Sequence, residues 1–216
     1  MLKHIDVTAV TGPRNSGITT LIKLIEKLAN CPKMVAIDVE TILDTHKERH
    51  TKTGKILREA ENFTRQGHYP DDLLVASGSL EWFQNLVPIR YPKAEHILIG
   101  RFPNGQFQNE VLGHFASSRI VHVNATKEQT MRNARNVLER EVLETAWKEY
   151  CKKTAAVIAV LNGSTIPVEF SQPLEEKIAT IIDNMTIPGH VRKNMIKRLQ
   201  TRDHPVRREI RCIQGL

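Results

Sequence analysis

The chain has 216 residues and a formal net charge of +7, with 40% hydrophobic and 25% charged residues. This length and balance are typical of one globular domain, and no apolar run in the sequence reaches the length of a membrane span. The three cysteines lie far apart without a C-x-x-C pair, which argues against a disulfide framework and against a metal site. We therefore expect reduced thiols, a cytoplasmic location and no membrane partner.

The N-terminal stretch predicts a buried strand, a Gly-rich turn and a helix. Gly12 and Gly17 have the spacing of the phosphate-binding motif G-x-x-x-x-G-K-[ST], but Ile18 occupies the Lys position. The amides of such a turn and the following helix N-terminus attract an anion without any side chain. We expect a vestigial phosphate-binding loop, with a plain turn as the alternative. Its residues are Gly12, Arg14, Asn15, Ser16, Gly17, Thr19 and Thr20.

The rest of the chain alternates between strand and helix patterns. Helical patterns cover residues 40–66, a segment beginning at 70, a long segment from 126 to about 161 with at most a brief break, and a segment opened by Pro173. Short apolar runs predict further strands at residues 33–39, 95–100, 119–123 and 166–170. This alternation predicts an α/β fold with a parallel sheet and right-handed crossovers.

Besides the loop, four stretches of the chain follow one another in a characteristic order, at residues 54–73, 97–108, 150–158 and 166–173. Together with the loop they resemble the nucleoside monophosphate kinases of the adenylate kinase family. The resemblance implies a P-loop nucleotide-kinase-like fold, with a five-stranded parallel sheet flanked by helices. It also implies a domain at residues 1–187, with a helical monophosphate-type lobe inserted at about 40–72 and a shortened lid, followed by a basic C-terminal extension at 188–216.

The same resemblance shows which catalytic charges have changed. Ile18 replaces the loop Lys, Gly100 the Asp that organises Mg²⁺ and Asn104 a phosphate-holding Arg, and Thr145 and Ala146 replace a Lys-Arg pair. Because phosphoryl transfer depends on positioned charges, we expect no kinase activity.

Other family positions are retained. Gln108 matches the position that contacts the monophosphate base, Thr19 matches a Mg²⁺-ligand position, and Arg135 matches one Arg of the lid. We nevertheless predict no catalytic residue, no metal and no cofactor, apart from weak binding of ATP or another nucleotide.

The net charge is concentrated at the C-terminus. Residues 188–216 hold eight basic against two acidic residues, a net +6, whereas the other 187 residues hold 23 basic against 22 acidic, a net +1. Residues 189–199 predict one amphipathic helix, and the later arginines show no helical spacing. A solubilising tail is one interpretation, and binding to a phosphate backbone is the other. The predicted contacts are Arg192, Lys193, Lys197, Arg198, Arg202, Arg207, Arg208 and Arg211, joined by Lys47, Arg49, Lys52, Lys55 and Arg101.

Together these patterns predict a sequence-nonspecific nucleic-acid-binding protein on a degenerate nucleotide kinase fold. We expect RNA rather than DNA, because the sequence has no helix-turn-helix or zinc-finger pattern. A basic relative without the catalytic charges also resembles the kinase-like proteins of large bacteriophages. Two alternatives stay open: an active nucleoside monophosphate kinase with displaced cations, and a scaffold that binds nucleotide. The oligomeric state is left open.

Overall fold

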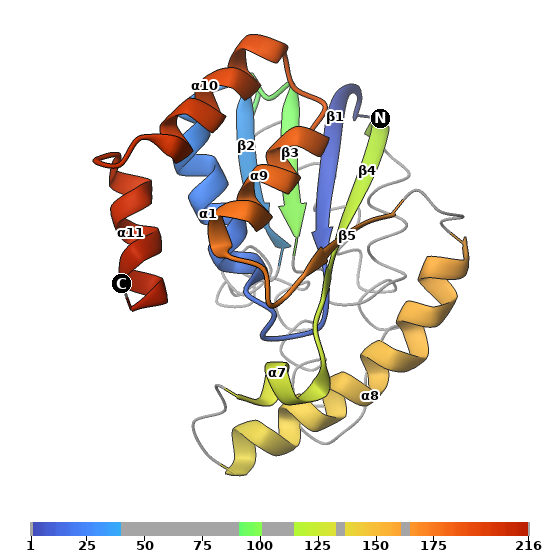
Figure 1. Cartoon of the computed structure of the whole chain (residues 1–216). Helices are drawn as coiled ribbons and strands as arrows, with labels where there is room; N and C mark the ends of the chain where they lie inside the picture. The colour runs from blue at the N-terminus through green and yellow to red at the C-terminus, as the bar shows by residue number, and fades with distance from the viewer. Residues whose placement is uncertain (1, 40–90, 101–114, 133–136, 161–164, 216) are drawn as a thin grey trace, which may run out of the picture.

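The computed structural model describes residues 2–39, 91–100, 115–132, 137–160 and 165–215 (Figure 1). Five strands form one parallel sheet in the order β2-β3-β1-β4-β5. They are β1 (Leu2–Thr11), β2 (Met34–Asp38), β3 (His96–Gly100), β4 (Phe115–Asn124) and β5 (Thr165–Glu169). The predicted five-stranded parallel sheet is therefore confirmed. The predicted lobe at 40–72 lies outside the described residues.

Six helices lie in the described part of the chain. They are α1 (Ile18–Ala29), α7 (Lys127–Met131), α8 (Val137–Val160), α9 (Leu174–Asn184), α10 (Gly189–Gln200) and α11 (Pro205–Gln214). Figure 1 shows α1, α9 and α10 against one face of the sheet, α11 outside α1, and α8 beside α7 at the lower right. Helix α7 begins with a capping box, in which the Thr126 side chain accepts from the Gln129 amide and the Gln129 side chain accepts from the Thr126 amide. None of the described helices has the length and apolarity that crossing a bilayer requires.

The sheet is apolar because its inner strands are covered on both faces. Val7, Ala9 and Val10 of β1 are fully buried, and β1 pairs with β3 on one side and β4 on the other. Continuous apolar runs are what a strand needs when helices lie on both faces of a parallel sheet. All strands run the same way, so β1, β2, β3 and β4 end at one edge, where ligands of open α/β sheets bind.

The basic C-terminal segment packs onto this core. Four side chains of α10 and α11 belong to the same buried cluster as α1 and α9: Met195, Leu199, Val206 and Ile210. Each such side chain contributes about 1.5–3 kcal/mol when removed from water. The expectation that residues 202–211 lack helical spacing is wrong, because Val206 and Ile210 lie one turn apart and fix α11 to the body.

Candidate functional site

The Gly-rich turn between β1 and α1 has a tightly folded backbone. A Cβ added at Gly12 would lie 2.9 Å from the carbonyl oxygen of Val123 in β4, so only glycine fits there. Gly17 and Asn15 adopt left-handed conformations with φ of 84° and 68°, which glycine and asparagine tolerate best. The Asn15 amide also donates to the carbonyl of Thr130, 2.9 Å away, which ties the loop to α7.

The inner side of this loop offers donors that are not used within the described protein. Gly17 caps α1 without a side-chain hydrogen bond, and the first turn contains no acidic residue. The first amides of a helix have no intrahelical acceptor, and the helix dipole makes this end positive. Ser16 is only 3% exposed, and its Oγ, which faces Gly12, has no hydrogen-bond partner among the described residues. A buried unpaired hydroxyl beside an uncapped helix N-terminus is suited to an anion.

A carboxylate lies next to the loop, although sequence reasoning did not predict it. The Thr19 hydroxyl, in the first turn of α1, donates to Oδ2 of Asp38 at 3.0 Å. Asp38 is the last residue of β2, so its side chain belongs to the edge of the sheet that holds the loop. The signal was present in the sequence, since an acid that closes a short apolar strand is placed at the ligand-binding edge.

Two of the predicted charge losses are in direct contact. Ile18 is 6% exposed, and its Cγ2 would lie 2.8 Å from a Cβ added at Gly100. The same added atom would lie 2.6 Å from Ile22 Cδ1 and 2.8 Å from the carbonyl oxygen of Val10. The position that the kinase resemblance assigns to a Mg²⁺-organising carboxylate is therefore closed by apolar side chains and by backbone.

A hydrogen-bonded chain connects the end of β1 to α8. His122 of β4 bonds through Nδ1 to the Thr11 hydroxyl at 2.9 Å and through Nε2 to the Tyr150 hydroxyl at 2.5 Å. The imidazole is 7% exposed, and burial lowers the pKa of His122 below its usual value. The neutral ring donates with one nitrogen and accepts with the other, which matches its two hydroxyl partners. No sequence motif pointed to His122.

The eight basic residues of the C-terminal segment fall into two groups. Four bind within the protein. Arg198 donates to the carbonyls of Leu28 and Ala29 at the end of α1, at 2.6 and 3.0 Å. The other three internal bonds are Arg192 to the Met185 carbonyl, Arg207 to the Glu175 carboxylate and Arg211 to the Arg202 carbonyl. The remaining four side chains are exposed and make no hydrogen bond or ion pair with a described residue: Lys193, Lys197, Arg202 and Arg208.

Two further predicted site residues lie within the described part of the chain, and seven lie outside it. Arg14 and Thr20 lie in the described loop and first turn of α1, Arg14 exposed and Thr20 half-buried. The predicted positions outside the described residues are Lys47, Arg49, Lys52, Lys55, Arg101, Gln108 and Arg135. Their proposed roles stay predictions.

Comparison with known proteins identifies the fold. No model of a protein family and no curated protein matches the chain. Among solved structures, a gluconokinase from Sinorhizobium meliloti 1021 matches with a TM-score of 0.52 and 13% identity, over 94% of this chain and 99% of its own. An unliganded sugar kinase from Janibacter sp. HTCC2649 matches with a TM-score of 0.51 and 15% identity, over 83% of this chain and 93% of its own. The chain has a P-loop kinase-like fold.

Proposed function

We propose that this chain binds a phosphorylated nucleotide at the loop formed by residues 12–19 and does not transfer its terminal phosphoryl group at the rate of a kinase. The observation that carries this proposal is the buried, unpartnered Ser16 hydroxyl beside the uncapped N-terminus of α1. Amides and a hydroxyl bind a phosphate group without the missing Lys. The P-loop kinase-like fold supports a ligand at this edge of the sheet.

The residues at this edge also suit a Mg²⁺ ion that arrives with the nucleotide. Mg²⁺ is usually held by one or two carboxylates together with phosphate oxygens and waters, rather than by a cage of protein ligands. Asp38 supplies a carboxylate and Thr19 a hydroxyl, and the two side chains already lie in hydrogen-bond contact. The bound ion would neutralise phosphate charge. Asp38 would hold the Thr19 hydroxyl in place, and the loop amides would bind phosphate oxygens.

The apolar contact between Ile18 and Gly100 supports the loss of transfer activity. Kinases stabilise the charge that develops on the transferred group with positioned cations and metal ligands. Here the Lys position holds a buried aliphatic side chain, and position 100 has no room for a carboxylate. Descent from an adenylate-kinase-type enzyme and a degenerate, phage-like character are part of this proposal. An active monophosphate kinase with displaced cations is the alternative.

Calorimetric titration with ATP, with and without Mg²⁺, tests the binding. We expect binding that weakens in Thr19→Val and in Asp38→Asn, mainly in the presence of Mg²⁺. Thr180→Val, a matched change in α9 far from the loop in sequence, should bind as the wild type does. No heat of binding at millimolar ATP would refute the proposal, and equal affinity in all four proteins would refute the role of Thr19 and Asp38 in binding Mg²⁺ with the nucleotide.

A coupled ATP-consumption assay with the common nucleoside monophosphates tests the absence of transfer. A turnover in the range of about 1–10³ s⁻¹ typical of enzymes would favour the active kinase instead. Nucleic-acid binding by the C-terminal segment is a separate proposal, because it depends on other residues.

A further inference from the structure

We propose that the outward side of α10, α11 and the turn between them binds the sugar-phosphate backbone of single-stranded RNA. The binding surface, called the basic face below, consists of the four exposed cations Lys193, Lys197, Arg202 and Arg208. The other four basic residues of the segment are not part of it, because their guanidinium groups are bound within the protein.

The helical spacing of α10 separates a core side from a cationic side. Met195 and Leu199 are buried against the body, one turn apart. Lys193 and Lys197 are also one turn apart, but on the exposed side, where they are about 5–6 Å from each other at Cβ. The other exposed residues of the helix are Gly189, His190, Asn194 and Gln200, so this side of α10 carries no acid.

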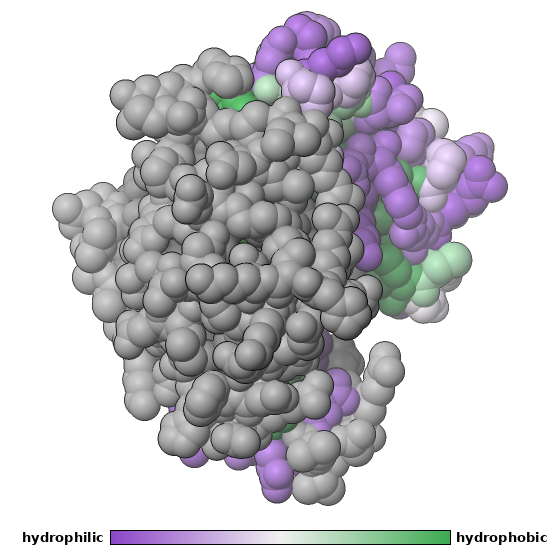
Figure 2. Space-filling view, turned by 180° about the vertical axis from the view of Figure 1, so that it is seen from behind, coloured by the Kyte–Doolittle hydropathy of each residue, from purple (hydrophilic) through white to green (hydrophobic). Residues whose placement is uncertain are grey.

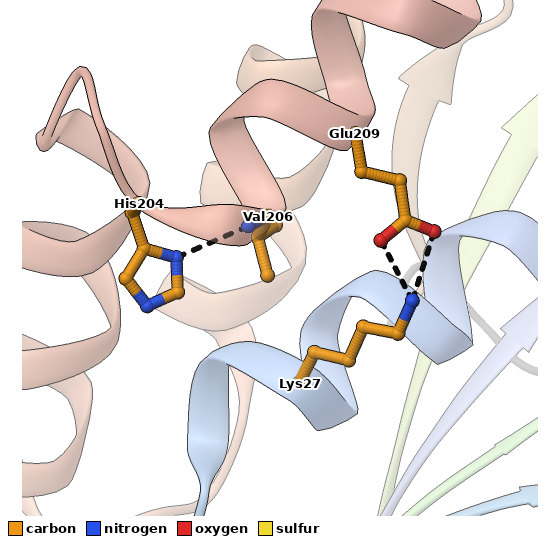
Figure 3. A network of polar contacts seen from close by, with 4 residues as sticks. All are labelled: Lys27, His204, Val206 and Glu209. Carbon is orange, nitrogen blue, oxygen red and sulfur yellow. Dashed lines mark hydrogen bonds and ion pairs between the residues drawn. The ribbon is translucent and has the colours of Figure 1, made fainter.

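One of the three arginines of α11, Arg208, is exposed as well. Val206 and Ile210 point into the core, and Glu209 accepts from the Lys27 ammonium of α1 at 2.6 and 2.9 Å (Figure 3). This ion pair directs the acid of α11 toward α1 and leaves Arg208 exposed. The other acid of the segment, Asp203, is exposed in the turn between the helices. The basic face therefore combines four cations with one carboxylate.

The composition of this surface favours a backbone ligand over base recognition. Figure 2 shows a mostly hydrophilic surface on the side of the molecule where α10 and α11 lie. These two helices contain no aromatic residue apart from His190, so they offer no platform on which bases stack. Lys and Arg neutralise phosphates irrespective of sequence. A flexible single strand can follow the one exposed side of α10, which is 12 residues or about 18 Å long.

The test measures how the full-length protein binds a fluorescein-labelled oligouridylate as salt is raised. Each neutralised phosphate on a single strand contributes about −0.7 to the slope of log affinity against log salt, so four contacts predict about a 50-fold loss of affinity between about 50 and 200 mM salt. Replacing Lys193 and Lys197 together by Ala should reduce that loss to about 7-fold. The matched control replaces Lys23 and Lys148, exposed lysines of α1 and α8, by Ala. It removes the same charge and should keep the wild-type slope.

Three results would overturn the proposal. The first is absence of RNA binding at low salt. The second is an equal slope in the Lys193/Lys197 variant and the control, which would place binding elsewhere on the protein. The third is tighter binding to duplex DNA of equal length, which would exclude single-stranded RNA as the preferred ligand. The variants change only exposed side chains, and a thermal unfolding curve measured by circular dichroism confirms that each one folds.

Discussion

Gly100→Ala tests whether packing around position 100 excludes the carboxylate that the kinase resemblance assigns to it. An added methyl group would come within 2.8 Å of Ile18 Cγ2, 2.6 Å of Ile22 Cδ1 and 2.8 Å of the Val10 carbonyl oxygen. The two isoleucine side chains can shift slightly, but the carbonyl belongs to the central strand of the sheet and cannot move without disturbing its pairing. We therefore expect the variant to fold with reduced stability.

The magnitude follows from the crowding of a close-packed interior. Inserting one extra carbon into a well-packed core costs about 1–3 kcal/mol. Gly100→Asp should cost more, because it adds the same clash and also buries an unpaired carboxylate. Combining Gly100→Ala with Ile18→Ala should not restore wild-type stability. That change removes the contact with Ile18 Cγ2 but leaves the contacts with Ile22 and with the Val10 carbonyl.

The free energy of unfolding is measured by urea titration followed by circular dichroism. Gly189→Ala is the matched control, because no atom lies within 4 Å of a Cβ added at the exposed first residue of α10. It should leave stability unchanged or raise it by up to about 1 kcal/mol, as Ala favours helix over Gly. If the free energy of unfolding of Gly100→Ala lies within about 0.5 kcal/mol of the wild-type value, packing around residue 100 does not explain why a carboxylate is absent there.

Two further predictions concern other parts of the fold. Arg198→Met should lower the free energy of unfolding by about 1.5–3 kcal/mol, because it leaves the last carbonyls of α1 without their charged donor, whereas Lys197→Met should be neutral in the same urea titration. Because the pKa of His122 is lowered in the folded protein, the unfolded chain binds more protons when the pH falls below about 6.5. The free energy of unfolding therefore keeps the full contribution of His122 above that pH and declines below it. His122→Gln should flatten this decline, and an equal decline in both proteins would show that other groups cause it.

Much of the fold could be predicted because it is encoded locally. The strand at residues 34–38 is a short apolar run, and the capping box at Thr126 needs only residues three positions apart. The loop was identified for the same reason, since its two glycines stand at a fixed spacing. Residue types that a turn or a buried strand requires are visible in the sequence before any tertiary contact is known.

The contacts that the sequence could not indicate join distant segments. Arg198 binds carbonyls 169 and 170 positions earlier, and His122 bonds to a hydroxyl 111 positions away. The spacing of the arginines alone could not separate those that cap α1 or pair with Glu175 from those that face outward. The sequence did not indicate helix α11 for a related reason. Its only buried residues are Val206 and Ile210, and charged residues adjoin both in the sequence.

Helix α1 contacts both proposed binding surfaces, the loop at its N-terminus and α10 at its C-terminus. Its N-terminus adjoins the loop, where the positive end of the helix dipole favours an anion. Its C-terminus is held by Arg198, whose charge complements the negative end of the same dipole, and this bond fixes α10 on the body. The loop lies one length of α1 from that bond, about 18 Å for 12 residues. The loop site depends on the N-terminus of α1 together with Ser16, Thr19 and Asp38, whereas the basic face depends on exposed cations of the C-terminal segment, so either proposal can fail while the other stands.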